Sequence, residues 1–197
     1  MLDLSDNYAI ISYTYFQLNL NFTEFSDKMR KSFLHKDIIW NQLLSWLFIQ
    51  QRDYSKAFAQ ERAIFKRQPE SLRGILDLAN ITSEQDEVEV AKDIVNYVIE
   101  NIMEPSLVLD AHKDLLELEI KHSNRDNYAT INQKYKDLLE LYGRNIQTTN
   151  LQLSYAKFKA FHLDQAQNAI TFLKETLETR ISRVQEARVK LLLGDIL

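Results

Sequence analysis

Apolar residues recur three or four positions apart along almost the whole 197-residue chain, and strict apolar–polar alternation is rare. This spacing places apolar side chains on one face of an α-helix, so it predicts a helical chain. The presence of only three glycines and two prolines agrees, because tight hairpins and phosphate-binding loops consume glycine. The periodicity predicts helices over 5–18, 22–35, 38–51, 54–67, 70–82, 86–102, 106–122, 126–142, 147–161, 164–179 and 183–197.

Polar residues, prolines and one glycine mark where these helices begin and end. The expected N-caps are Asn21 with Glu24 as its reciprocal partner, Asp37, Asp53, Asp126 and Ser182. Pro69 and Pro105 suit the first turn of a helix, and Gly143 stands where a helix should stop. The breaks are short, and no Pro-, Gly- or Ser-rich linker separates two domains.

Three kinds of residue repeat with one period. A shift of 34 residues relates Leu44-Ser45 to Leu78-Ala79, Ala57 to Ala91, and Ile64 to Val98. In an array of helical hairpins, the large residues fill the space between paired helices and the small ones permit close approach. One such hairpin cannot bury both of its faces alone, so copies stack. The period therefore predicts a helical-repeat protein in which Ala57 and Ala91 are fully buried at helix contacts.

The residues at these positions resemble the tetratricopeptide-repeat family over about 38–197. Leu44, Ala57 and Pro69 match its pattern, with Phe48 as a fair substitute and Ser45 as a small residue in place of glycine. Asn41 departs from the pattern, and Glu61 stands where the family has an aromatic residue. The resemblance implies an all-α fold, an α-α superhelix in which antiparallel helix hairpins form a right-handed solenoid.

We interpret the chain as one helical-repeat domain. It would comprise a divergent N-terminal hairpin (1–37), four repeat-like units (38–71, 72–105, 106–145 and 146–181) and the start of a further unit (182–197). The last helix ends at Gly194-Asp195-Ile196-Leu197, which is apolar where a solenoid normally has a polar cap. We therefore expect a piece of a longer array, or an end that another chain covers.

Composition narrows the possible functions. The net charge of −4 is poorly suited to a nucleic-acid surface, and the absence of cysteine excludes disulfides and thiolate zinc sites. Glu119 and His122 form a single E-x-x-H pair, whereas a di-iron site needs a second pair on another helix. No catalytic or phosphate-binding motif is found, so we expect neither an enzyme nor a metal or cofactor. No stretch is long and apolar enough to span a membrane, and residues 1–16 lack the basic start of a signal peptide.

The family resemblance implies that the first helix of each pair lines a concave surface that binds peptides or folded partners. Carried over by register, this surface would contain Ile39, Gln42, Trp46, Ile49, Gln50, Arg73, Leu76, Asn80 and Ser83. Trp46 faces away from the intra-pair core, so it either anchors a partner or packs against the hairpin 5–35. Asn80 and Arg73 fit part of the family's carboxylate clamp, but Gln42 and Trp46 stand where the clamp needs Lys and Asn, so no clamp is predicted.

We expect a non-enzymatic scaffold that binds a protein or peptide partner and no nucleic acid. The alternative is a structural subunit of a larger assembly that self-associates through its apolar C-terminal end. The string from Trp40 to Phe58 also resembles segments of long repeat proteins of the gram-negative cell envelope. That resemblance implies a periplasmic or envelope-associated bacterial protein.

Overall fold

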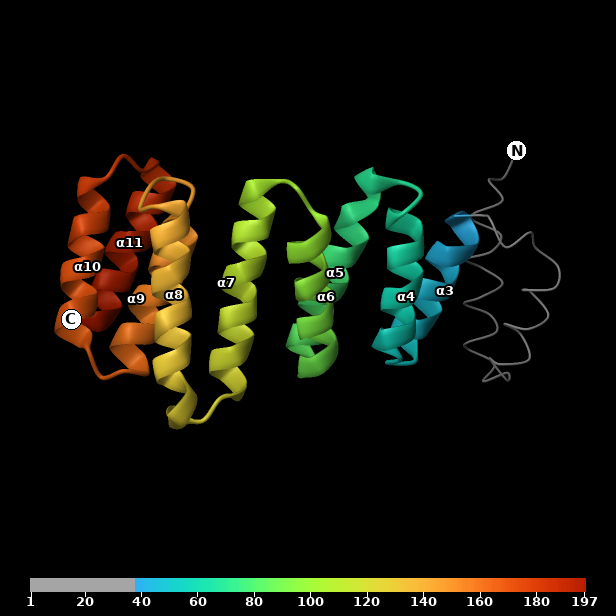
Figure 1. Cartoon of the computed structure of the whole chain (residues 1–197), viewed down its shortest axis with the longest axis horizontal. Coiled ribbons are helices and arrows are strands. Elements are labelled where there is room, and N and C mark those ends of the chain that lie inside the picture. Colours follow the sequence, from blue (N-terminus) through green and yellow to red (C-terminus); the bar gives the residue numbers. More distant parts are fainter. Residues whose placement is uncertain (1–37) are drawn as a thin grey trace. The chain divides into compact units, whose positions relative to one another are not determined.

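The computed structural model describes the backbone of residues 38–197 and all side chains of that range except those of Ile39 and Trp40. Within it every regular element is helical, which confirms the all-α prediction there (Figure 1). The α-helices are α3 (Ile38–Gln50), α4 (Tyr54–Phe65), α5 (Leu72–Glu84), α6 (Val88–Asn101), α7 (Pro105–His122), α8 (Tyr128–Tyr142), α9 (Thr149–Phe161), α10 (Ala166–Glu178) and α11 (Arg183–Ile196). Each lies within two residues of its predicted bounds, and the predicted helices 5–18 and 22–35 lie outside the described residues.

Most of the predicted signals that fall within the described residues mark helix ends in the structure. The Asp53 carboxylate accepts a hydrogen bond from the Lys56 backbone N–H, and Ser182 forms a reciprocal capping box with Gln185. Gly143 ends α8 with a φ of 74°, a conformation that favours glycine. These residues therefore mark helix boundaries. The side chains of Asp53 and Ser182 accept hydrogen bonds from backbone N–H groups, and Gly143 has a backbone conformation that ends the helix.

One predicted cap is wrong. Asp126 lies inside the 3₁₀ helix η2 (Arg125–Asn127), and α8 begins after Asn127, which makes no side-chain capping bond. The 3₁₀ turn leads directly into the helix, so the first turn needs no separate cap at Asp126. Pro69 likewise opens a 3₁₀ helix, η1 (Pro69–Ser71), before α5, whereas Pro105 is the first residue of α7. Asp37, Asn21 and Glu24 lie outside the described residues.

The chain divides into two compact units, of which the first ends at Ile94 and the second spans Val95–Leu197. In the first, α4 packs against both α3 and α5. The described core of this unit contains Leu43, Leu44, Leu47, Phe48, Tyr54, Ala57, Phe58, Ile64, Ile75, Leu78, Ala91 and Ile94. Ala57 and Ala91 have no exposed surface, so the prediction that both are buried is confirmed.

Glu61 makes a polar contact between three helices where the repeat pattern has an aromatic residue. The buried Ser45 hydroxyl on α3 donates a hydrogen bond to Glu61 Oε1 on α4, at 2.5 Å. A Cβ atom on Gly74 of α5 would lie 2.2 Å from Glu61 Oε2, so a larger residue at position 74 would make the carboxyl group shift from this position. Burial raises the pKa of Glu61, and the Asp77 charge adds to this while the Ser45 hydrogen bond opposes it.

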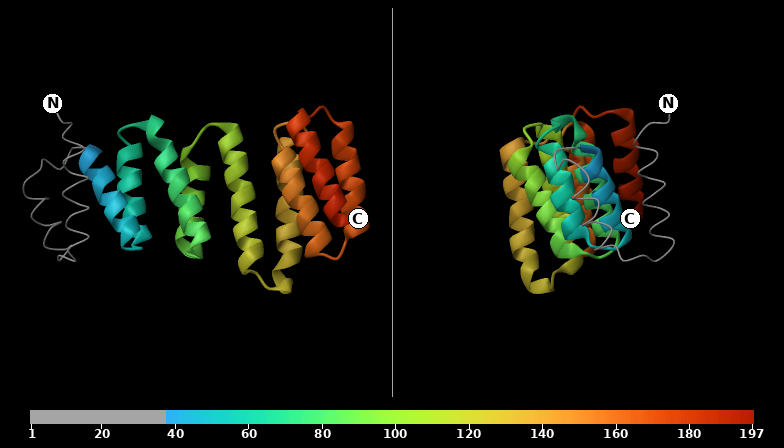
Figure 2. Two further views of the ribbon diagram at one scale, coloured as in Figure 1. Left: turned by 180° about the vertical axis from the view of Figure 1, so that it is seen from behind. Right: turned by 90° about the vertical axis from the view of Figure 1, so that its right-hand side faces the viewer.

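In the second unit, α9 contacts α7, α8, α10 and α11. Helices α10 and α11 are in contact and lie side by side both in Figure 1 and in the view from behind in Figure 2. Tyr135 stacks on Tyr155 with ring centroids 5.0 Å apart, and on Phe158 at 5.7 Å. The cluster also buries Leu109, Leu116, Ile131 and Leu151. Helix α9 is therefore the element around which this unit packs.

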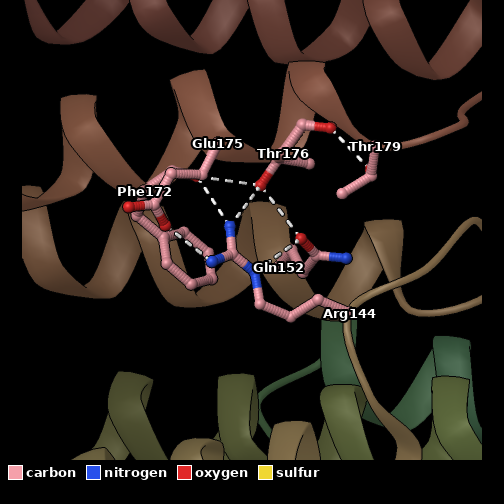
Figure 3. A network of polar contacts seen from close by, with 6 residues as sticks. All are labelled: Arg144, Gln152, Phe172, Glu175, Thr176 and Thr179. Carbon is pink, nitrogen blue, oxygen red and sulfur yellow. Dashed lines mark hydrogen bonds and ion pairs between the residues drawn. The ribbon is translucent and has the colours of Figure 1, made fainter.

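Arg144, in the loop after α8, fixes α9 to α10 (Figure 3). Its guanidinium donates to Glu175 at 2.7 Å, to the Phe172 carbonyl at 3.0 Å and to Thr176 Oγ1 at 3.2 Å. It also lies 4.1 Å from the centroid of the Phe172 ring. Thr176 in turn donates to the fully buried Gln152 of α9 at 2.9 Å. This network satisfies buried polar groups that would otherwise oppose the packing of the two helices.

The burial of Ala57 predicts that a larger side chain there will overpack the hairpin. Ala57→Leu should lower the free energy of unfolding by about 1–3 kcal/mol, and Ala91→Leu should do the same. Ala59 lies on the same helix but is exposed, so Ala59→Leu is a matched control with an expected change below about 0.5 kcal/mol. Urea unfolding followed by circular dichroism measures all three; equal losses for Ala57→Leu and Ala59→Leu would contradict the packing.

The close approach of Glu61 to Gly74 predicts that the effect of Gly74→Ala on the free energy of unfolding changes sign when Glu61 is replaced by alanine. In the wild-type chain, Gly74→Ala should displace Glu61 from Ser45 and lower the free energy of unfolding by about 1 kcal/mol. In a Glu61→Ala background the displaced carboxyl is absent, so Gly74→Ala should instead stabilise the helix by up to about 1 kcal/mol. A double-mutant cycle by urea unfolding measures this coupling, and the same effect in both backgrounds would disprove it.

Candidate functional site

The second unit contains a pocket of about 390 Å³ on its surface. It is formed by α7, α9 and α11, the helices that begin the predicted units 106–145, 146–181 and 182–197. Its lining consists of Lys113, Glu117, Asn150, Leu153, Ser154, Lys157, Arg188, Leu191, Leu192 and Asp195. We call this the α7–α9–α11 pocket.

Helices α9 and α11 contribute residues at equivalent positions to the pocket lining. The lining positions on α9 are 150, 153, 154 and 157, and those on α11 are 188, 191, 192 and 195. A shift of 38 residues superposes one set on the other, and the spacing within each set selects one helix face. Corresponding faces of α9 and α11 therefore meet the same pocket.

On α7, Lys113 and Glu117 form an ion pair one helical turn apart. Lys113 Nζ lies 3.1 Å from Glu117 Oε2 and also donates to Asp114. Burial by itself would lower the pKa of Lys113, but the hydrogen bonds and charges of Asp114 and Glu117 outweigh it and raise the pKa. Lys113 is therefore a firmly protonated ammonium whose charge its own helix neutralises.

A chain of hydrogen bonds connects Glu117 to the core. The Ser154 hydroxyl donates to Glu117 Oε1 at 2.7 Å, and Tyr135 OH lies 2.7 Å from Ser154 Oγ. Because Ser154 uses its single proton toward the carboxylate, Tyr135 must donate to Ser154. Burial raises the pKa of Tyr135, so the phenol stays protonated in this role. The orientation of Glu117 in the pocket thus depends on a tyrosine that has no exposed surface.

The other charged lining residues are available to a ligand. The side chains of Lys157, Arg188 and Asp195 are exposed and make no hydrogen bond or ion pair with any other residue in the described range. Leu191 is 69% exposed although it is a large apolar side chain, and Leu153 is half-buried. The pocket therefore offers unsatisfied charges beside accessible apolar surface, a combination that suits binding.

The groove residues predicted on the first unit occupy α3 and α5. On α3, Gln42 and Gln50 are exposed, Trp46 is 37% exposed and Ile49 is half-buried. The side chain of Ile39 and the hairpin 5–35, the alternative cover for Trp46, lie outside the described residues. Trp46 is therefore accessible in the described structure.

On α5, the predicted groove residues are exposed or half-buried. Arg73 and Asn80 are exposed, whereas Leu76 and Ser83 are half-buried. Arg73 pairs with Asp77 on its own helix, at 3.6 Å. Across the described residues, no hydrogen bond or ion pair joins the α3 set to the α5 set. Their joint role as one surface stays a prediction.

The predicted groove did not include any residue of the α7–α9–α11 pocket, although Asp195 belongs to the C-terminal end that was expected to be covered by another chain. The predicted groove was confined to residues 39–83, because the register of the first helix of 106–145 was not evident. A usable signal was present, since Tyr155-Ala156 and Leu193-Gly194 are the same pair of residue classes 38 positions apart. The residues just before each pair, Ser154 and Leu192, line the pocket.

The E-x-x-H pair has a different partner in the structure. Glu119 forms an ion pair with Lys134 of α8, at 2.5 Å. Among residues 38–197, no three His, Asp or Glu side chains gather as a metal site would require. Nor does any helix in that range have both the length and the apolar composition needed to cross a membrane.

Two comparisons, with protein families and with curated proteins, found no match. The functional argument therefore depends on the geometry of the chain itself.

The hydrogen-bond chain predicts that Ser154 matters for stability. Ser154→Ala should leave the buried Tyr135 hydroxyl without a partner and lower the free energy of unfolding by about 1–3 kcal/mol. Ser106→Ala, at an exposed position of the same unit, is the control and should cost less than about 0.5 kcal/mol. Adding Tyr135→Phe to Ser154→Ala should recover part of the loss, because the unpaired hydroxyl is then gone. Urea unfolding of the four proteins measures this; no recovery would argue against the chain.

Proposed function

We propose that this protein is a non-enzymatic interaction scaffold that binds a protein or peptide partner on the surface formed by the first helices of its repeat units. The proposal includes a tetratricopeptide-like arrangement, in which helix hairpins stack into a superhelical solenoid. The observation that carries it is the α7–α9–α11 pocket, formed by three such first helices with α9 and α11 in identical register.

The way in which helical repeats stack supports the proposed scaffold function. Stacked hairpins bury the faces that contain the small residues, as for Ala57 on α4 and Ala156 on α9. The remaining face of each first helix then forms a continuous surface that is free to bind. Side chains at spacings of three, four and seven residues occupy that face, as the lining of α9 and α11 does. The exposed Trp46 on α3 fits the same role in the first unit.

The chemistry of the pocket supports binding over catalysis. Ser154 is buried, and both Tyr135 and Glu117 occupy its hydroxyl, so it has a structural role. Lys113 and Glu117 neutralise each other. The lining also contains the exposed and unpaired side chains of Lys157, Arg188 and Asp195 with apolar Leu191, an arrangement typical of a recognition surface.

Selection from a random peptide display library against the purified full chain tests this function. We expect enriched peptides whose affinity falls at least about tenfold in Leu191→Asp, because the substitution places a charge in the apolar contact. Leu141→Asp is the matched control, since Leu141 is 74% exposed on α8 and does not line the pocket. Both leucines are exposed, so neither variant should unfold the chain. Failure to enrich any peptide, or equal binding to Leu191→Asp, would reject the proposal.

A further inference from the structure

We propose that the α7–α9–α11 pocket takes a peptide segment in which one apolar side chain is flanked by a basic residue on one side and an acidic residue on the other. This inference rests on the proposed function and deepens it by naming the chemistry of the partner. It follows from the charged groups on the three helices and from the apolar side chains that line the same pocket.

The α7 edge is acidic. Between 110 and 117, α7 carries Asp110, Asp114 and Glu117 against the single ammonium of Lys113. Lys113 is committed to Asp114 and Glu117, and Asp110 accepts from Asn150 Nδ2 at 3.4 Å. Of these residues only Lys113 and Glu117 line the pocket, so the excess of carboxylate lies on α7 beside the lining, where it favours a basic group of the partner.

The acceptor on that edge is held in place. Glu117 Oε1 is bound by the Ser154 hydroxyl and Oε2 by Lys113, and Tyr135 orders Ser154 from the core. A carboxylate oxygen accepts more than one hydrogen bond, so both oxygens keep capacity for a ligand. A partner gains a pre-oriented acceptor and does not have to order it, which favours affinity.

The α9 and α11 side carries the unpaired cations. Lys157 on α9 and Arg188 on α11 have no hydrogen-bond or ion-pair partner within residues 38–197, and both line the pocket. Asp195 is the one acid of this side that lines the pocket, and it lies at the register position of Lys157. Two cations against one acid leave a positive excess, which favours an acidic group of the partner.

Apolar side chains line the same pocket as these charges. Helix α9 contacts both α7 and α11, and it contributes Leu153 to the lining, while α11 contributes Leu191 and Leu192. An exposed leucine beside two other leucines favours contact with an apolar side chain. A purely acidic segment would meet Glu117 and Asp195, and a purely basic one would meet Lys157 and Arg188. A segment with both signs avoids both repulsions.

Fluorescence anisotropy with labelled synthetic nonapeptide pools tests the inference on the full chain. Every pool has a central leucine; two mixed pools carry lysine and glutamate on opposite sides in either order, and two others carry only lysine or only glutamate. We expect one mixed pool to bind roughly three- to tenfold more tightly than either single-sign pool. Glu117→Gln should remove its advantage over the glutamate pool, and Lys157→Gln its advantage over the lysine pool. Lys174→Gln, at an exposed position of α10, is the control and should preserve both.

The outcomes separate this inference from the proposed function. If the glutamate pool binds as tightly as the mixed pools, the pocket is a simple anion site and the inference is wrong. If display-selected peptides bind through Leu191 but carry no pair of opposite charges around an apolar residue, the inference fails and the scaffold function stands. If display yields no peptide that depends on Leu191, the proposed function itself fails. Selected peptides with the mixed pattern support both.

Discussion

Close approach of helices at alanine is the constraint on which the rest of this structure depends. Ala57, Ala91, Ala156 and Ala169 have no exposed surface, and they lie on four different helices. A larger side chain at any of them would push neighbouring helices apart, and the large apolar residues beside them would lose their contacts. In the second unit, Ala156 packs with Leu173, Val189 and Leu192, and this contact joins α9 to α10 and α11 beside the α7–α9–α11 pocket.

The positions of the described helices could be predicted from the sequence, whereas the polar contacts between helices could not. Apolar periodicity with caps such as Asp53 and Ser182 located the helices, because local hydrogen bonding determines where a helix can begin. The prediction that Asp126 caps a helix was wrong, because aspartate is common both at helix N-caps and in turns, and the sequence does not distinguish the two. Glu61 could be identified as a departure from the repeat pattern, but its fit against Gly74 depends on a third helix.

For the candidate site as well, some residues could be identified from the sequence and others could not. Trp46 was identified from the family register and from helix geometry, and its side chain is 37% exposed in the structure. The α7–α9–α11 pocket was missed because the spacing between α9 and α11 is 38 residues, while the clearest repeats earlier in the chain are 34 apart. The role of Tyr135 could not be predicted, since its partners Ser154 and Glu117 come from other helices and only packing brings them together.

The network around Arg144 has a consequence for how the second unit opens. One guanidinium joins the loop after α8 to α10, and Gln152 extends the same network into α9. Breaking the bonds to Gln152 or Thr176 leaves buried polar groups without their partners, so the loop, α9 and α10 have little to gain by separating one at a time. Their backbone amides should therefore share one opening free energy in native-state hydrogen exchange and behave as a single cooperative foldon.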